Sequence, residues 1–127
     1  MEVVNNQQTF SQIKRILHNH STLLDAYGLL EPIILELFGA QRMSIFQRRR
    51  QHQDLVARFK TGKETLEIKV PINAMSIAGY VALSQKPVVI DDPYNATMLQ
   101  SIHPRLRFEG KFDKDNDFKT QNILCVP

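Results

Sequence analysis

The sequence predicts an α+β domain, because the spacing of its apolar residues changes along the chain. Up to Phe38, apolar residues recur at every third or fourth position, as they do in amphipathic helices. From Arg42 onwards they alternate with polar residues, as they do in strands. After Asn73, short helical and strand patterns are mixed. The chain has 127 residues, which is enough for one domain with its own hydrophobic core.

Two helices are predicted before the strands. The first has its apolar side within Phe10–Leu17, where the apolar residues follow helical spacing. The second runs from about Ser21 to Phe38. Pro32 lies inside this stretch and should start a helix there or kink one. Gly39 is a natural C-terminal stop.

Three strands follow, and polar turns separate them. The predicted strands are Arg42–Arg49, Leu55–Lys60 and Thr65–Ile72, and the third shows the cleanest alternation. The turns fall at Arg50–Gln53 and Thr61–Glu64. Since the connections are short, we expect an antiparallel meander.

The segment from Asn73 to Asp92 combines a short helix with a short strand. Ser76 can cap the helix, and Gly79 lies inside it, where glycine lowers stability. We therefore expect another group to approach the Gly79 backbone closely. Pro87 stops the helix, and Val88–Ile90 follows as a buried strand.

The remaining part of the chain predicts one more helix and one more strand. The helix spans about Ala96–Ile102, and the strand lies within Asn122–Val126. Between them, Arg105–Thr120 is charged and has no apolar period. We expect this loop to be mobile, either as a lid or without order.

Composition and charge exclude several classes of protein. An apolar content of 43% and a charged content of 23% are those of an ordinary globular protein. No apolar run is long enough to span a membrane, and the polar N-terminus is no signal peptide. A net charge of +3 is low for a nucleic-acid-binding domain. The single cysteine, Cys125, excludes an internal disulfide and favours a cytoplasmic location.

Three motifs in this order resemble a GAF domain, the small-molecule sensor and dimerisation module of many signalling proteins. Leu37–Phe46 (LFGAQRMSIF) is similar to the family's junction between helix and first strand. Ser76–Ala82 (SIAGYVA) with Lys86–Asp92 (KPVVIDD) is similar to its central helix and the strand after it. Phe118–Pro127 (FKTQNILCVP) is similar to its fifth strand.

The resemblance covers residues 21–127, and residues 1–20 are expected to form a helix that leads into the domain. It implies a central antiparallel sheet, related to that of PAS domains, with the N-terminal helices on one face and short helices and loops on the other. The family has a further strand and a C-terminal helix after the point where this chain stops, so the domain is expected to be truncated at Pro127. A sheet edge without its usual neighbour would favour a homodimer or strand exchange.

In GAF domains a ligand lies between one face of the sheet and the helices and loops that cover it. The resemblance implies that Ser44 and Phe46 on the first strand would line this site, with Tyr80, Asp92 and Phe118 as the first choices for contacts. Aromatic walls with a few polar groups suit a flat ligand with polar edges, and a cyclic nucleotide is the candidate. The full set of expected ligand-binding residues is Ser44, Phe46, Ile77, Tyr80, Asp91, Asp92, Tyr94, Phe108 and Phe118.

These residues also have structural interpretations. The aromatic side chains can simply fill the core, and Asp91–Asp92 before Pro93 can shape the turn into the next helix. The run Arg48–Arg50, with Lys60 and Lys63 nearby, is typical of a solvated strand end.

The sequence contains no recognisable catalytic or metal-binding motif. Asp113, Asp115 and Asp117 imitate the start of a calcium-binding loop, but that motif requires glycine where Phe118 stands. The run His18–His20 lacks the surroundings of a nuclease motif. Cys125 lacks the second cysteine that thiol redox chemistry needs. We therefore expect no enzymatic activity.

Two functions remain as hypotheses. The first is a cytoplasmic regulatory domain of a larger bacterial signalling or ATPase-type protein. It would bind a small molecule and act on a covalently attached output domain by a population shift. The second is a ligand-free module for dimerisation and signal relay, with the Phe10–Leu17 side of the first helix as its interface. Neither hypothesis includes a nucleic acid or a membrane as partner.

Overall fold

The computed structural model describes residues 6–61 and 64–127, and its fold is α+β as predicted. The chain divides into two compact units. The first takes in the N-terminal part up to Phe46 together with Ala57–Ile68, and the second takes in Gln47–Val56 and Lys69–Pro127. Each unit is described by itself.

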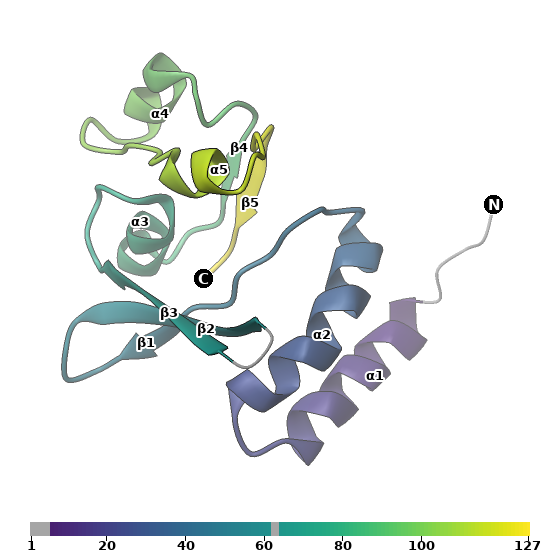
Figure 1. Ribbon diagram of the computed structural model, residues 1–127. Coiled ribbons are helices and arrows are strands. Elements are labelled where there is room, and N and C mark those ends of the chain that lie inside the picture. The colour runs from purple at the N-terminus through teal and green to yellow at the C-terminus, as the bar shows by residue number, and fades with distance from the viewer. Residues whose placement is uncertain (1–5, 62–63) are drawn as a thin grey trace. The chain divides into compact units, whose positions relative to one another are not determined.

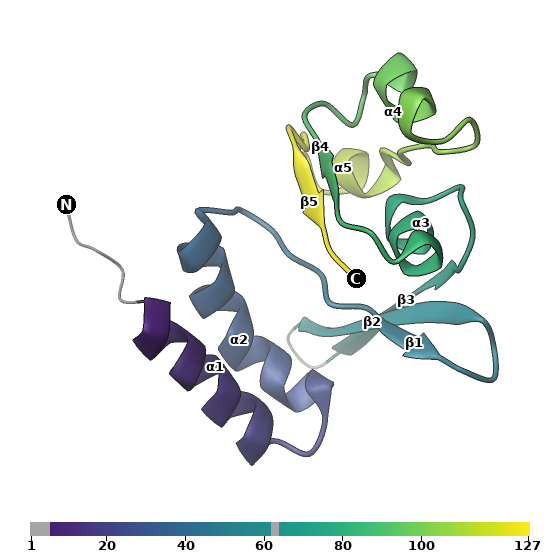
Figure 2. The ribbon, with the colours of Figure 1, turned by 180° about the vertical axis from the view of Figure 1, so that it is seen from behind.

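Two helices begin the first unit. Helix α1 spans Asn6–Asn19 and helix α2 spans Leu23–Phe38, and the two lie side by side and run in opposite directions (Figures 1 and 2). The Thr22 hydroxyl caps α2 by accepting a hydrogen bond from the Asp25 amide (3.2 Å). Gly39 ends α2 in the left-handed conformation with φ of 59°, which confirms the predicted stop. Because α2 runs through Pro32, a helix start at that residue is wrong.

Three strands form an antiparallel sheet in the order β1-β2-β3. Strand β1 is Gln47–Arg49, β2 is Asp54–Thr61 and β3 is Glu64–Pro71. The register of the first pair is Gln47 opposite Val56 and Arg49 opposite Asp54. The predicted meander is therefore confirmed. Gly62 and Lys63, in the predicted turn between β2 and β3, lie outside the described residues.

The first predicted strand is too long. Pairing with β2 begins at Gln47, so Arg42–Phe46 lies before β1 rather than in it. The carbonyl oxygen of Met43 accepts a hydrogen bond from the Tyr27 hydroxyl (2.9 Å). In a strand, this carbonyl would instead accept a hydrogen bond from the backbone amide of a neighbouring strand. Ser44 and Phe46 were expected on this strand and lie instead in the segment that precedes it.

The second unit contains three short helices and a separate two-stranded sheet (Figure 1). In this antiparallel sheet, Val88 lies opposite Cys125 and Ile90 opposite Ile123. The strands within residues 6–61 and 64–127 thus form two sheets instead of one central sheet. The elements are α3 (Ile77–Ser84), β4 (Val88–Ile90), α4 (Ala96–Ile102), α5 (Lys111–Asp115) and β5 (Ile123–Cys125).

The core of the second unit lies between α3, α4 and the inner side of the two-stranded sheet. Its buried side chains are Val81, Val88, Ile90, Leu99 and Leu106. The outer side of the sheet is apolar as well, because the paired residues Val89 and Leu124 are 68% and 56% exposed. Within the described residues, no helix has the length and apolarity needed to cross a bilayer.

Candidate functional site

The N-terminus of α3 is fixed by a cap and by a close backbone approach. The Ser76 hydroxyl accepts a hydrogen bond from the Gly79 amide (3.0 Å), which confirms the predicted cap. A Cβ atom at Gly79 would lie 2.8 Å from the Asn73 carbonyl oxygen and closer still to that of Pro71. The expected close approach is therefore confirmed, and the approaching group is the chain's own backbone.

Two of the expected ligand contacts, Ile77 and Tyr80, come from α3 and pack against the core of the second unit. The Tyr80 ring also contacts His103 at the end of α4, with 5.8 Å between ring centroids and a tilt of 51°. His103 is held in turn, because its Nδ1 accepts a hydrogen bond from the Arg105 amide (3.1 Å). Ile77 and Tyr80 thus have structural roles whether or not a ligand binds.

Asp92, the second residue of the acidic pair after β4, shapes a turn, as the structural interpretation of the pair predicts. Asp92 Oδ1 accepts a hydrogen bond from the Tyr94 amide (3.0 Å), and the Asp92 carbonyl oxygen accepts one from the Asn95 amide (3.1 Å). Pro93 between them is buried. Asp91 remains exposed at the end of the strand.

Tyr94 is the centre of a group of contacts that joins distant parts of the chain. Its hydroxyl donates a hydrogen bond to Asp113, and its ring packs edge-on against Phe108 with 5.2 Å between centroids. The Lys119 ammonium lies 5.6 Å from the centroid of the ring. A Cβ atom at Gly110 would lie 3.4 Å from the same ring, which therefore has backbone beside it. Even so, Tyr94 keeps 45% of its surface exposed.

Asp113 is a buried carboxylate at 4% exposure. Besides the bond from Tyr94, it accepts one from the Thr120 amide and one from the Thr120 hydroxyl, each at 2.8 Å. Its carbonyl oxygen accepts a bond from the Phe118 amide (2.9 Å). A buried carboxylate needs several donors to offset its lost hydration, and this one has them. Of the two alternatives for Arg105–Thr120, a loop without order is therefore wrong, because the segment contains α5 and is tied at Asp113, and a lid stays a prediction.

Sequence reasoning missed Asp113 as an anchor. It considered this residue only as a calcium ligand, and its hydroxyl partner lies 19 positions earlier in the chain. The local signal was weak, since an aspartate in the first turn of a five-residue helix is ordinary helix chemistry. Within the described residues, no group of three or more metal-ligating side chains could hold an ion.

The nine expected ligand residues are divided between the two units of the chain. Ser44 and Phe46 belong to the first unit, and the others belong to the second. Within the second unit, the Tyr94 side chain contacts Asp113 and Phe108, and Phe118 joins them through its backbone amide, which donates to the Asp113 carbonyl oxygen. We call Tyr94, Phe108, Asp113, Phe118 and Lys119 the Tyr94 cluster.

In the second unit, the surroundings of the Tyr94 hydroxyl and of the Cys125 thiol on β5 change the pKa of each group. The hydrogen bond to Asp113, aided by burial, raises the pKa of Tyr94 above its ordinary value of 10.0. Burial raises the pKa of the Cys125 thiol, which packs against the core. A thiol with a raised pKa is a poorer nucleophile at neutral pH than an ordinary cysteine, although Cys125 is half-buried and not fully buried as expected.

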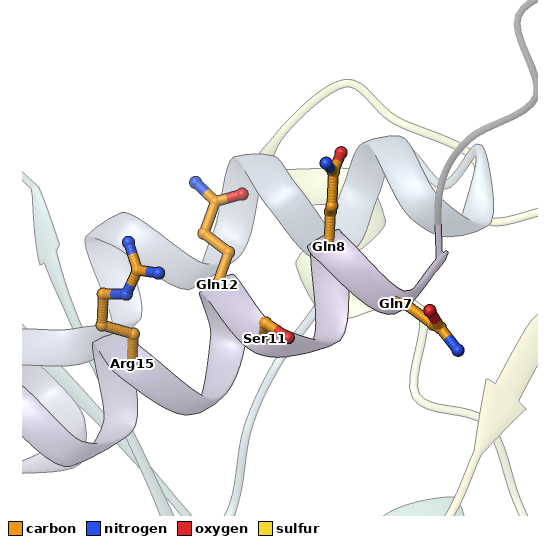
Figure 3. Close-up of a pocket in the computed structure, with 5 residues that line it drawn as sticks. All are labelled: Gln7, Gln8, Ser11, Gln12 and Arg15. Carbon is orange, nitrogen blue, oxygen red and sulfur yellow. The ribbon is translucent and has the colours of Figure 1, made fainter.

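A surface depression of about 600 Å³ lies along α1 and is lined by Gln7, Gln8, Ser11, Gln12 and Arg15 (Figure 3). Gln8, Gln12 and Arg15 project on the same side of the helix (Figure 3). All five residues come from one helix, so the depression has no opposite wall. Ligand sites usually enclose most of the ligand's surface, and this one would not.

The basic run at β1 is partly neutralised. Arg49 forms a two-pronged ion pair with Asp54, with its Nε 2.7 Å from Oδ1 and its second contact at 2.5 Å. The side chains of Lys60 and Lys63, expected nearby, lie outside the described residues. The Arg49 contact is typical of a strand end held by its neighbour.

Comparisons of the chain with models of protein families and with curated proteins found no match.

Proposed function

We propose that the chain is a regulatory GAF-like domain that binds a flat, anionic small molecule of the cyclic nucleotide class. The observation that carries the proposal is the half-exposed Tyr94 ring with the Lys119 ammonium beside it.

The chemistry of the Tyr94 cluster suits such a ligand. An exposed aromatic face can stack on a base, and stacking of this kind contributes about 1–3 kcal/mol per base in proteins that bind single-stranded nucleic acids. The Lys119 ammonium would pair with the phosphate. Asp91 is exposed at the end of β4 and offers oxygens to an amino or hydroxyl donor.

The same contacts give a route for the signal. Tyr94 follows β4, and Thr120 precedes β5, so Asp113 links both strands through its hydrogen bonds. A ligand that binds one arrangement of Tyr94 more tightly would favour the matching arrangement of the 113–120 segment. In the full-length protein the attached output domain would read this population shift.

Replacing the cation of the Tyr94 cluster tests the proposal. Isothermal titration of the wild-type chain with cyclic AMP and with cyclic GMP should show saturable binding. Lys119→Met should weaken that binding roughly tenfold, since it removes a hydrogen-bonded charge pair. Lys86→Met is the matched control, because Lys86 is an exposed lysine outside the Tyr94 cluster. Absence of binding to the wild type, or an equal loss in both variants, would contradict the proposal.

A second candidate function is a ligand-free module for dimerisation and signal relay. The observation that favours it is the exposed apolar surface of α1, which contains no fully buried residue although Phe10 and Leu17 are apolar. A dimer whose dissociation constant does not change when cyclic nucleotides are added would favour this function over ligand sensing.

A further inference from the structure

Basic side chains of the second unit gather around Asp54, the first residue of β2. The hydrogen bond from Arg49 lowers the pKa of Asp54, and the charges of Arg49, His52 and Lys69 lower it further. Arg49 holds the carboxylate through two contacts, so it occupies both oxygens. Among the described residues, the charged groups that affect this pKa are all basic.

Two further arginines lie on either side of Arg49 in the chain. Arg48 and Arg50 are exposed, and neither has an acidic partner within the described residues. The segment Gln47–Val56 contains three arginines and one aspartate, so it carries two of the chain's three net positive charges. We call Arg48, Arg49, Arg50, His52 and Lys69 the basic cluster.

The basic cluster has more charge than the protection of a strand end needs. A charged side chain on an edge strand is enough to discourage unwanted pairing. Like charges at neighbouring positions repel one another, and Asp54 offsets the charge of Arg49 alone. The charges of Arg48 and Arg50 are left over, and an acidic partner would offset them.

The turn that carries these side chains is held in place by its backbone. The His52 amide donates to the Arg49 carbonyl oxygen (3.3 Å), and the Ile72 amide, just after β3, donates to the Gln53 carbonyl oxygen (3.2 Å). The backbone beside Arg50 is thus ordered before a partner arrives. A surface that is ordered in advance loses less conformational freedom on binding.

The side chains of this hairpin favour an acidic peptide as the partner. Gln47–Val56 contains no aromatic residue, whereas proteins that bind single-stranded nucleic acids stack the bases on aromatic rings. The exposed turn Arg50–Gln53 is polar throughout, whereas segments that bind membrane surfaces insert apolar side chains. Arginine forks match the geometry of carboxylates, and the amides of Gln51 and Gln53 can bond to a peptide backbone.

We propose that the basic cluster is a docking surface for an acidic, extended peptide segment of another protein. Arg48 and Arg50 are two positions apart, so their Cα atoms are separated by at most about 7 Å. Side chains on one face of an extended peptide repeat at about the same distance. Carboxylates at alternate positions of the partner would therefore meet both arginines. The inference is independent of the functions proposed above.

Fluorescence anisotropy with a labelled peptide of five Glu-Ser repeats tests the surface. The wild-type chain should bind the peptide saturably, and binding should weaken as salt is added, because exposed charge pairs are screened. Arg48→Gln combined with Arg50→Gln should raise the dissociation constant roughly tenfold, since two charge pairs are lost. Arg105→Gln combined with Arg107→Gln is the matched control and should leave the constant unchanged. It removes the same charge from exposed positions of the second unit outside the basic cluster.

A second variant keeps every arginine in place. Gln51→Glu adds a carboxylate at an exposed position of the turn and should also weaken binding, because it offers the arginines a partner within the chain. Circular dichroism of each variant checks that the fold is kept. Absence of binding to the wild type, or an equal loss in both double variants, would overturn the proposal. Tighter binding of a labelled uridine decamer than of the peptide would overturn it as well, because the partner would then be a nucleic acid.

Discussion

Because Gly79 has no side chain, the N-terminus of α3 can lie close to the backbone of the segment before it. Its amide is bound by Ser76, and the carbonyl oxygens of Pro71 and Asn73 occupy the space that a Cβ atom would take. Gly28 on α2 is the opposite case, because nothing lies within 4 Å of the place where its Cβ atom would stand. The two glycines therefore differ in packing although both lie in helices.

Alanine at these two positions should have opposite effects on stability. Gly79→Ala should lower the free energy of unfolding by about 1–3 kcal/mol, because the crowded backbone must shift. Gly28→Ala should raise it by about 0.5–1 kcal/mol, because alanine favours an open helical site. Urea unfolding followed by circular dichroism measures both. A Gly79→Ala protein as stable as the wild type would show that the N-terminus of α3 is not packed in this way.

Asp113 provides a second test at the scale of one residue. Asp113→Asn replaces an acceptor by an amide and should cost about 1–3 kcal/mol, since at least one buried donor from Tyr94 or Thr120 loses its partner. Asp115→Asn on the same helix is the control, because Asp115 is exposed and should tolerate the change. Urea unfolding compares the variants, and equal stabilities would mean that Asp113 does not anchor the segment.

At the scale of elements, the sequence predicts the helices, caps and turns that depend on residues close together in the chain. Both long helices, the cap at Ser76 and the turn at Asp92 were predicted, because each depends on residues within a few positions. The first strand was predicted too long, because its length is set by a partner and the Arg42–Phe46 backbone lies outside the ladder. α5 was missed because five residues show no apolar period.

In the candidate site too, the sequence did not predict the contacts between residues that are distant in the chain. Tyr94 was named from a resemblance, but the side chains that hold it, Asp113 and Lys119, were not named with it. Their meeting depends on the path of the chain between the two strands of the second sheet, which no local pattern encodes. Ser44 and Phe46 were placed on a strand by alternation alone, and alternation does not supply a partner strand.

At the scale of the whole molecule, two tyrosines predict how stability depends on pH. Burial, with a smaller contribution from Glu31, raises the pKa of Tyr27, whose hydroxyl donates to the Met43 carbonyl oxygen. The pKa of Tyr94 is raised by its bond to Asp113. When folding raises a pKa, the stability linked to it is complete below the unfolded value, here 10.0, and is lost as the pH rises through the folded value.

We therefore expect the free energy of unfolding to fall above pH 10, because the unfolded chain releases its tyrosine protons before the folded one does. Urea unfolding at a series of alkaline pH values measures the decline. Tyr27→Phe should be less stable at neutral pH, having lost a hydrogen bond, but should show a shallower decline. The same slope in the variant and the wild type would contradict the assignment to Tyr27.

Cys125 is a natural reporter on the opening of the second unit. It is the chain's one thiol, it packs against the core of the second unit, and partial burial raises its pKa. When β5 separates from β4, the half-buried thiol becomes fully exposed and regains the ordinary reactivity of a cysteine. A thiol-reactive dye should therefore react with the native protein at a rate that reports how often the second unit opens. The measurement needs no engineered cysteine.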